Sequence, residues 1–460
     1  MAWQSHLRHI TEAVKSQADE QAAGLCNTLG YHLQIVGDYA AARPYLEQAL
    51  AIREEILGTK HPDTAQSLNN LGYLLRSIGD WAAARPYLEQ ALAVREEILG
   101  AKHPDTATSL SDLGMLLVDM DELAVAHLYY ERALTIREEI LGAKHPDTAT
   151  SLNNLGHLLR AMSEYSAAQP YFERALAISE EVLGPQHPET ALFLNNLGYL
   201  LQDMGELTAA LPYLEQALAI RKEILGTKHP NTAQSLNNLG LLMLAQGELT
   251  VAQPYLEQAL AIYQEVFGAK HPETARGLNN LGVLLARQGD WIAAFRYLER
   301  VLAIREETSG AKHPETAKCL NNLGYVLRNM GDYTAARSYL ERALAIQEEV
   351  LGAKHSDTAY GLTNLGNLLK EQGEYAVARP YLERALVIRQ EVLGPQHPDT
   401  AQSLNNLGEL VQAQGEYMAA RLYFERALVI SEERFGSSHS YTEKVRRNLI
   451  ALEEVVKQNT

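Results

Sequence analysis

Apolar residues recur along this chain at the three- and four-residue spacing of an α-helix. One apolar stripe runs from Ala65 to Leu75, and a second runs from Ala84 to Ile98. Each stripe predicts a helix with one buried face. The two helices, each about 16 to 19 residues long, together predict a helix-turn-helix hairpin.

The hairpin recurs with a period of 42 residues, and its phase never slips. Residues 21–440 therefore predict ten repeats in an all-α solenoid, where stacked neighbours bury the apolar faces that one hairpin leaves open. Amphipathic segments at 1–20 and 441–460 predict a capping helix at each end. The period is clearest in ten histidines, namely His61, His103, His145, His187, His229, His271, His313, His355, His397 and His439.

Residues at the ends of the predicted helices agree with the hairpin. Pro62 follows a histidine at the start of the first helix, where the missing N–H of proline costs nothing. Asp80 follows Gly79 and is a candidate N-cap for the second helix. The positions of Gly72 and Ala84 are Gly and Ala in all ten copies, so we expect the two helices to approach closely there.

The small-Leu-Gly and Ala positions of this repeat resemble the tetratricopeptide repeat, whose usual unit has 34 residues. The longer unit, with LNNLG in the first helix, ALAIREEILG in the second and KHPDTA between repeats, is similar to the repeats of kinesin light chains. The resemblance implies a right-handed superhelix whose concave groove is lined by the first helix of each repeat. It also implies a protein- or peptide-binding scaffold that holds extended peptides, with asparagines of the first helix on the peptide backbone.

The chain departs from kinesin light chains because it has no N-terminal heptad coiled coil and its repeats are more alike. Such arrays also resemble the repeat region of bacterial and fungal NOD-like signalling ATPases. This second resemblance implies an alternative function, the ligand-sensing part of a larger receptor. The sequence holds no GxxxxGK[ST] phosphate-binding loop.

Three series of positions on the first helix are candidate peptide-binding residues. An asparagine amide offers both a donor and an acceptor, so a ladder of amides suits a peptide backbone; the alternative is that the amides tie neighbouring repeats together. Variable aromatic and basic positions beside the ladder predict recognition of side chains and of acidic groups on the ligand. The candidates are Asn69, Asn153, Asn195, Asn237, Asn279, Asn321 and Asn405, with Tyr73, Tyr199, Tyr325, Arg76, Arg160 and Arg328.

A second asparagine follows the first in most repeats and is a weaker candidate for the groove. Its copies are Asn70, Asn154, Asn196, Asn238, Asn280, Asn322, Asn364 and Asn406.

The formal net charge of −17 argues against nucleic acid as a partner, because phosphate backbones require a basic surface. No segment approaches the roughly 20 apolar residues of a membrane span, and the N-terminus lacks the pattern of a secretory signal. Cys26 and Cys319 form no redox or metal motif. These features predict a cytoplasmic protein that binds other proteins, with self-association through the array ends as a further possibility.

No pattern predicts an enzyme, a metal or a cofactor. Histidines placed once per repeat are separated by about one helix-packing distance of 10 Å, whereas zinc ligands lie about 2 Å from one ion. We therefore interpret the ten histidines as residues that satisfy the start of each first helix. Binding on the convex face remains an alternative to the groove.

Overall fold

The computed structural model describes residue 11, residues 19–437 and residues 439–459, with side chains up to residue 457. The described residues form 21 helices and no strand. The predicted capping helix at 1–20 falls almost wholly outside them. The first helices of the repeats, here the A helices, are α2 (Glu20–Ile35), α4 (Pro62–Ser77), α6 (Pro104–Asp119), α8 (Pro146–Ala161), α10 (Pro188–Asp203), α12 (Pro230–Gln246), α14 (Pro272–Arg287), α16 (Pro314–Asn329), α18 (Ser356–Glu371) and α20 (Pro398–Ala413).

Each A helix is followed by a B helix, and α22 (Ser440–Asn459) packs against the last of them. Its role as a cap stays a prediction. The B helices are α3 (Tyr39–Leu57), α5 (Trp81–Ile98), α7 (Leu123–Ile140), α9 (Tyr165–Val182), α11 (Leu207–Ile224), α13 (Leu249–Phe267), α15 (Trp291–Thr308), α17 (Tyr333–Val350), α19 (Tyr375–Val392) and α21 (Tyr417–Phe435).

The ten histidines begin nine of the A helices and α22, as the sequence predicts, whereas α2 begins after Asp19. In each of them Nδ1 accepts a hydrogen bond from the backbone N–H two residues later, at 3.0–3.2 Å. This bond satisfies one of the free N–H groups at the helix start. It also places the ring proton on Nε2, which leaves that nitrogen available as a donor.

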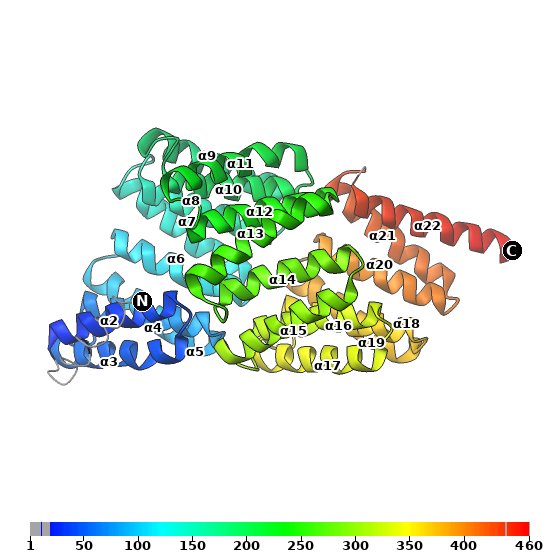
Figure 1. Ribbon diagram of the computed structural model, residues 1–460, viewed down its shortest axis with the longest axis horizontal. Coiled ribbons are helices and arrows are strands. Elements are labelled where there is room, and N and C mark those ends of the chain that lie inside the picture. The colour runs from blue at the N-terminus through cyan, green and yellow to red at the C-terminus, as the bar shows by residue number, and fades with distance from the viewer. Residues whose placement is uncertain (1–10, 12–18, 438, 460) are drawn as a thin grey trace.

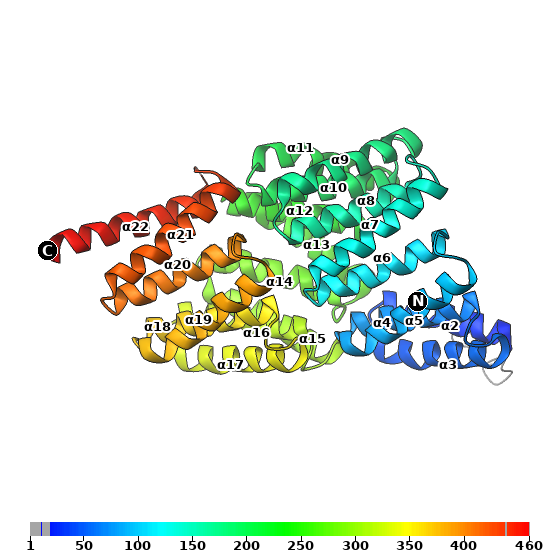
Figure 2. The same ribbon diagram turned by 180° about the vertical axis from the view of Figure 1, so that it is seen from behind.

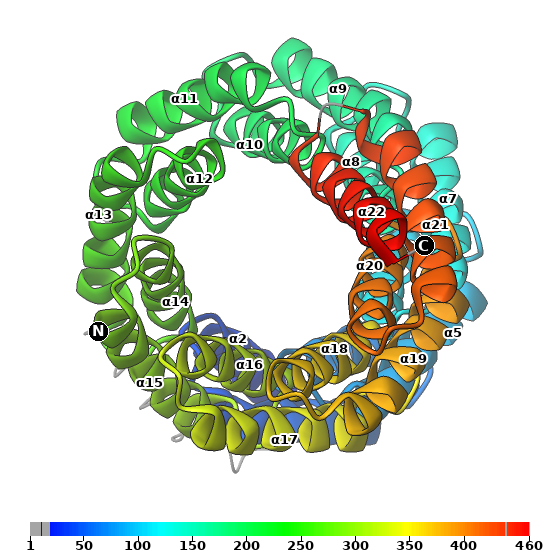
Figure 3. The same cartoon turned by 90° about the vertical axis from the view of Figure 1, so that its right-hand side faces the viewer.

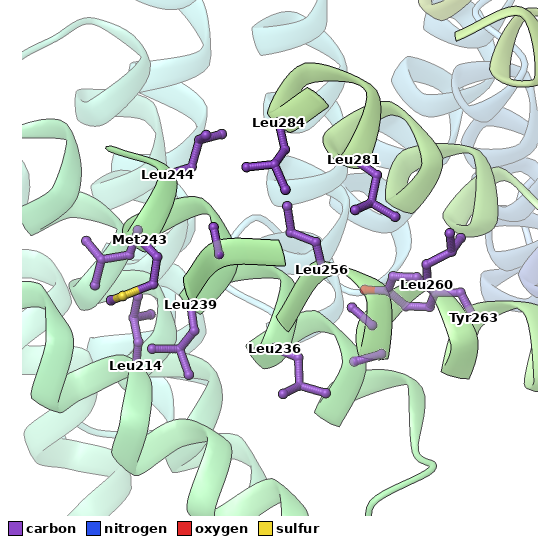
Figure 4. Packing of buried hydrophobic residues seen from close by; sticks show 14 of the residues in the cluster. Leu214, Leu236, Leu239, Met243, Leu244, Leu256, Leu260, Tyr263, Leu281 and Leu284 are labelled. Carbon is purple, nitrogen blue, oxygen red and sulfur yellow. The ribbon is translucent and has the colours of Figure 1, made fainter. Parts of the chain in front are cut away.

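The A and B helices of one repeat touch at the invariant glycine. A Cβ built on Gly72 would lie 2.7 Å from Leu88 of α5, and the equivalent atom on Gly240 would lie equally close to Leu256 of α13. Leucines of the A helix and alanines of the B helix fill the space between successive hairpins, and the resulting core is continuous from repeat to repeat. Figure 4 shows this packing around Leu236, Leu256 and Leu281.

The hairpins wind into a superhelix of nearly two turns. Viewed along its axis, the A helices form an inner ring and the B helices an outer ring (Figure 3). The two turns lie next to each other along the long axis of the molecule (Figures 1 and 2), and the A–B turn before α5 in the first contacts the start of α16 in the second. The A helices therefore line the concave side, which we call the inner wall.

Histidines of the second turn contact the first turn. Their Nε2 atoms face the A–B turns of repeats 1, 2 and 3, with His271 3.4 Å from the Ile35 carbonyl, His313 3.3 Å from the Ser77 carbonyl, and His355 3.0 Å from the carbonyl of residue 119. In the fourth contact His397 Nε2 lies 2.9 Å from the Ser163 hydroxyl. Two cavities of about 530 Å³ each lie between the turns beside these contacts, one lined by His313 and the other by His397.

The residues that differ from the repeat pattern at these contacts fit one another. Asp121 and Ser163 are the non-glycine residues with positive φ in the described chain, at 59° and 56°, where glycine is normally required. Asp121 Oδ2 accepts a hydrogen bond of 2.6 Å from the backbone N–H of Ser356. Most repeats carry proline at the position of Ser356, which has no N–H to donate. This match across 235 residues indicates that contact between the turns is part of the native fold.

Candidate functional site

The inner wall presents one stripe of partly exposed side chains from each A helix. In α4 the stripe consists of Gln66, Asn70, Tyr73 and Arg76, which are partly exposed, whereas Asn69 is buried among the leucines. The spacing of three and four residues places these four side chains on one face. The stripe agrees with the expected orientation of the Tyr73 and Arg76 series, but the asparagine on it is the second of each pair.

The first asparagines lie between neighbouring A helices. Six of them, namely Asn69, Asn153, Asn195, Asn237, Asn321 and Asn405, are only 1–8% exposed, and Asn279 is half-buried. In five of the seven, Oδ1 accepts a hydrogen bond of 2.7–3.2 Å from Nδ2 of the second asparagine in the following repeat. The donors are Asn196, Asn238, Asn280, Asn322 and Asn364. These bonds tie one repeat to the next, and contact of the first series with a peptide stays a prediction.

The second asparagines keep hydrogen-bonding capacity toward the inner wall. Each Nδ2 has two N–H groups, and in six of the eight copies one of them donates to the preceding repeat. These copies are Asn70, Asn196, Asn238, Asn280, Asn322 and Asn364. No hydrogen bond within the described chain occupies Oδ1 of Asn196, Asn322 or Asn364. The result is a row of amides in eight of the ten repeats, seven of them half-buried, and several keep donors or acceptors that the fold does not use.

The candidate arginines are matched by carboxylates of the chain itself. Arg160 donates to Asp203 at 2.7 Å and stacks over the ring of Tyr199 at 4.7 Å. Arg328 stacks over Tyr325 at 5.0 Å, with Glu371 of the next repeat at 3.5 Å. The same arrangement joins Arg76 to Tyr73 and to Asp119. These arginines hold the tyrosine rings in place, and an acidic ligand would compete with their internal partners.

Two adjoining cavities open on the inner wall of α14, α16 and α18. A cavity of about 340 Å³ is lined by the polar side chains Arg276, Arg305, Glu315, Lys318 and Asp357, among others. A second, of about 240 Å³, is lined mainly by apolar atoms, and Asn322 and Tyr360 border both. Its other lining residues include Val283, Ala286, Leu298, Tyr325 and Val326.

The charges in the larger cavity are fixed by one another. Burial alone would raise the pKa of Glu315, but Lys318 and Arg305 outweigh it, so its pKa is lowered and the carboxylate is ionised at neutral pH. Lys318 lies 3.1 Å from Glu315 and 3.4 Å from Asp357. Burial raises the pKa of the Cys319 thiol to about 12, so this cysteine is a neutral wall residue at neutral pH.

The two cavities were not predicted from the sequence, although the sequence carries a signal of them. Ser67 and its counterparts in four other A helices accept a hydrogen bond from an arginine of the preceding B helix. Consecutive repeats replace that serine with Gly277, Cys319 and Gly361. Three departures in a row from a conserved internal pattern mark the segment where both cavities lie.

Within the described residues, no group of three His, Cys, Asp or Glu side chains has the geometry of a metal site. The same part of the chain contains no helix with the length and hydrophobicity needed to cross a membrane.

A family model for the tetratricopeptide repeat matches nine overlapping segments that together run from residue 20 to residue 433. The chain belongs to the tetratricopeptide repeat family. Repeats of this family generally act as protein-interaction scaffolds, and the fold is typically non-catalytic.

Solved structures of kinesin light chain-like repeats are similar to parts of this tetratricopeptide protein. The nearly identical TPR-like repeats of a Podosopora anserina protein, classed with kinesin light chains, are 26% identical over 45% of this chain and 97% of that one, with a TM-score of 0.39. BtubC (BKLC) from P. vanneervenii is 25% identical over 50% of this chain and 91% of that one, with a TM-score of 0.41. No curated protein matches the chain.

Proposed function

We propose that this tetratricopeptide protein binds extended peptide segments of other proteins along its inner wall. The observation that carries the proposal is the row of second asparagines on the concave side, which is present in eight repeats. In this row Asn196, Asn322 and Asn364 keep an Oδ1 atom that no hydrogen bond within the described chain occupies. An extended backbone presents the complementary donors and acceptors along its length. The first asparagines support this row by fixing the spacing of the A helices.

Aromatic side chains beside the row supply contact area for ligand side chains. Tyr325 is 49% exposed and Tyr73 is 37% exposed, although arginine stacking holds both rings in one orientation. A large apolar surface held rigid at a polar edge is typical of binding sites, because little conformational entropy is lost when a partner binds. The variable positions of the Tyr73 series would then select among ligand side chains.

The proposal is tested by selecting peptides that bind the full chain and measuring their affinity for variants. We expect Asn322→Ala and Tyr325→Ala, both on the inner wall, to weaken binding of the selected peptides. Matched controls on the B helices are Leu128→Ala and Leu422→Ala, because both leucines are 64% exposed and face away from the inner wall. Weakening by the B-helix variants alone would place binding on the convex side and overturn the proposal.

A further inference from the structure

We propose that the inner wall at α14, α16 and α18 contains a two-part subsite, in which Arg305 binds a ligand carboxylate and the neighbouring cavity at Tyr325 and Tyr360 accepts an apolar side chain. The subsite rests on the proposed function, because it names the part of a peptide that this segment would recognise. Its evidence is independent of the asparagine row and comes from a comparison among copies of one arginine.

The arginine at this position of the B helix normally has a fixed set of partners within the fold. Arg53, Arg95 and Arg137 each donate from one terminal nitrogen to a backbone carbonyl ten residues later and to a serine hydroxyl fourteen residues later. Arg221 and Arg389 make the same two bonds. The arginine-to-hydroxyl distances lie between 2.7 and 2.9 Å in all five copies.

Arg305 lacks these partners because the serine is replaced by Cys319, whose thiol is a poor acceptor. Within the described chain its guanidinium makes no hydrogen bond, and its closest carboxylate oxygen is on Glu315 at 3.8 Å. The Arg305 side chain is nevertheless only 14% exposed. Its Nε is buried without a partner, as in Arg53, Arg137 and Arg221, so what distinguishes Arg305 is that its terminal nitrogens make no hydrogen bond either. A buried guanidinium with unused donors is costly, so the arrangement favours a ligand that supplies acceptors.

A carboxylate is the group that matches those donors. Two parallel hydrogen bonds from a guanidinium to a carboxylate are short and strong, and Arg305 lines the cavity of about 340 Å³ where such a group would enter. The other cations there are already engaged, since Lys318 pairs with Glu315 and Asp357 and Arg276 pairs with Glu273. Among the cations that line this cavity, Arg305 is therefore the one whose hydrogen-bond donors are unused.

The adjoining cavity fixes what lies next to the carboxylate. Its apolar lining by Val283, Ala286 and Leu298, with Tyr325 and Tyr360 beside them, suits one leucine or phenylalanine side chain in its volume of about 240 Å³. Because Asn322 and Tyr360 border both cavities, the carboxylate and the apolar group must lie close together in the ligand. A peptide offers this pair either at a C-terminal apolar residue or at an Asp or Glu beside an apolar residue.

The chain itself provides a matched variant. Cys319→Ser restores the hydroxyl that binds the arginine in five other repeats, so it withdraws Arg305 from the ligand while preserving the fold. Cys319→Ala removes the thiol without supplying an acceptor and leaves Arg305 available. The two variants change the same side chain by similar volumes, so a difference between them reports the arginine alone.

The test measures binding of synthetic probes to the full chain by calorimetry. The probes are acetyl-Gly-Gly-Gly-Gly-Phe with a free C-terminal carboxylate, the same peptide as its C-terminal amide, and acetyl-Gly-Gly-Glu-Phe-Gly amide. We expect a carboxylate-bearing probe to bind about tenfold more tightly than the amide, and Cys319→Ser but not Cys319→Ala to remove that advantage. The first and third probes distinguish a terminal carboxylate from a side-chain one.

If neither carboxylate probe binds more tightly than the C-terminal amide of acetyl-Gly-Gly-Gly-Gly-Phe, or if the two cysteine variants behave alike, the subsite is overturned. Binding of neither carboxylate probe would overturn it as well. These failures are distinguishable from failure of the proposed function, because peptides selected on the full chain would still bind the inner wall and would still be weakened by Asn196→Ala. Asn196 belongs to the row of second asparagines and lines neither cavity.

Discussion

Contact between the two superhelical turns can be tested by adding a single methyl group at one A–B turn. Gly79 of repeat 2 has φ +78°, and a Cβ built on it would lie 2.8 Å from Pro314 Cδ and 3.0 Å from the His313 ring in the second turn. Gly331, six repeats further along, has φ +83° and no atom within 4 Å of its Cβ position. Gly79→Ala and Gly331→Ala therefore share the backbone strain and differ in the contact.

The expected difference follows from these distances. Alanine in the left-handed region costs about 1–2 kcal/mol, and this cost is common to both variants. In Gly79→Ala the first turn must also move away from α16, which breaks the hydrogen bond of 3.3 Å from His313 Nε2 to the Ser77 carbonyl. Loss of that bond, together with the surrounding packing, adds about 1–2 kcal/mol.

The assay combines urea unfolding with small-angle X-ray scattering of the folded variants. We expect Gly79→Ala to unfold at lower urea than Gly331→Ala, and to show a larger radius of gyration because the turns separate. If the two variants match in both measurements, contact between the turns contributes nothing to the fold in solution, and the reasoning fails.

Three further predictions concern pH, helix packing and the cavity. Burial lowers the pKa of His313 to about 4, so the unfolded state binds the proton first and stability should fall as pH drops from about 6.5 toward 4; His313→Asn should flatten this part of a urea-unfolding pH series. Gly240→Ala should cost about 1–2 kcal/mol more in unfolding free energy than Gly282→Ala, since the added Cβ would lie 2.7 Å from a leucine in the first case and 3.1 Å in the second. Cys319→Ser should raise the unfolding free energy by about 1 kcal/mol by giving Arg305 a hydroxyl partner. A lower unfolding free energy would contradict the inference that Arg305 lacks a hydrogen-bond partner.

The helices and their stacking were predictable because the information is local and repeated. The histidine cap, the Asp80 cap and the close approach at Gly72 each depend on residues within one hairpin, and ten copies separate signal from chance. The inner-wall position of the Tyr73 series was predictable for the same reason. The fold class is confirmed, whereas the peptide-binding roles assigned to individual residues stay predictions.

Features that depend on the next repeat or the next turn were not predictable. The sequence could not say which asparagine of a pair faces the inner wall, because both positions border the buried stripe and a rotation of about 100° about the helix axis separates them. It also could not reveal that Arg160 is neutralised by Asp203, since this partner is 43 residues away. Contacts between Asp121 and Ser356 depend on the superhelical pitch, which no single repeat encodes.

Those contacts alter how the molecule unfolds. A repeat array is usually described as a one-dimensional chain in which every unit touches only its two neighbours. Here histidines 236 residues beyond an A–B turn add a third neighbour. Each such repeat therefore contacts a repeat of the adjacent superhelical turn as well as its neighbours in sequence, and the array forms a tube. Fraying from either end then breaks bonds to the adjacent winding as well as to the preceding hairpin. A tube of this kind resists partial unfolding most strongly where the windings overlap.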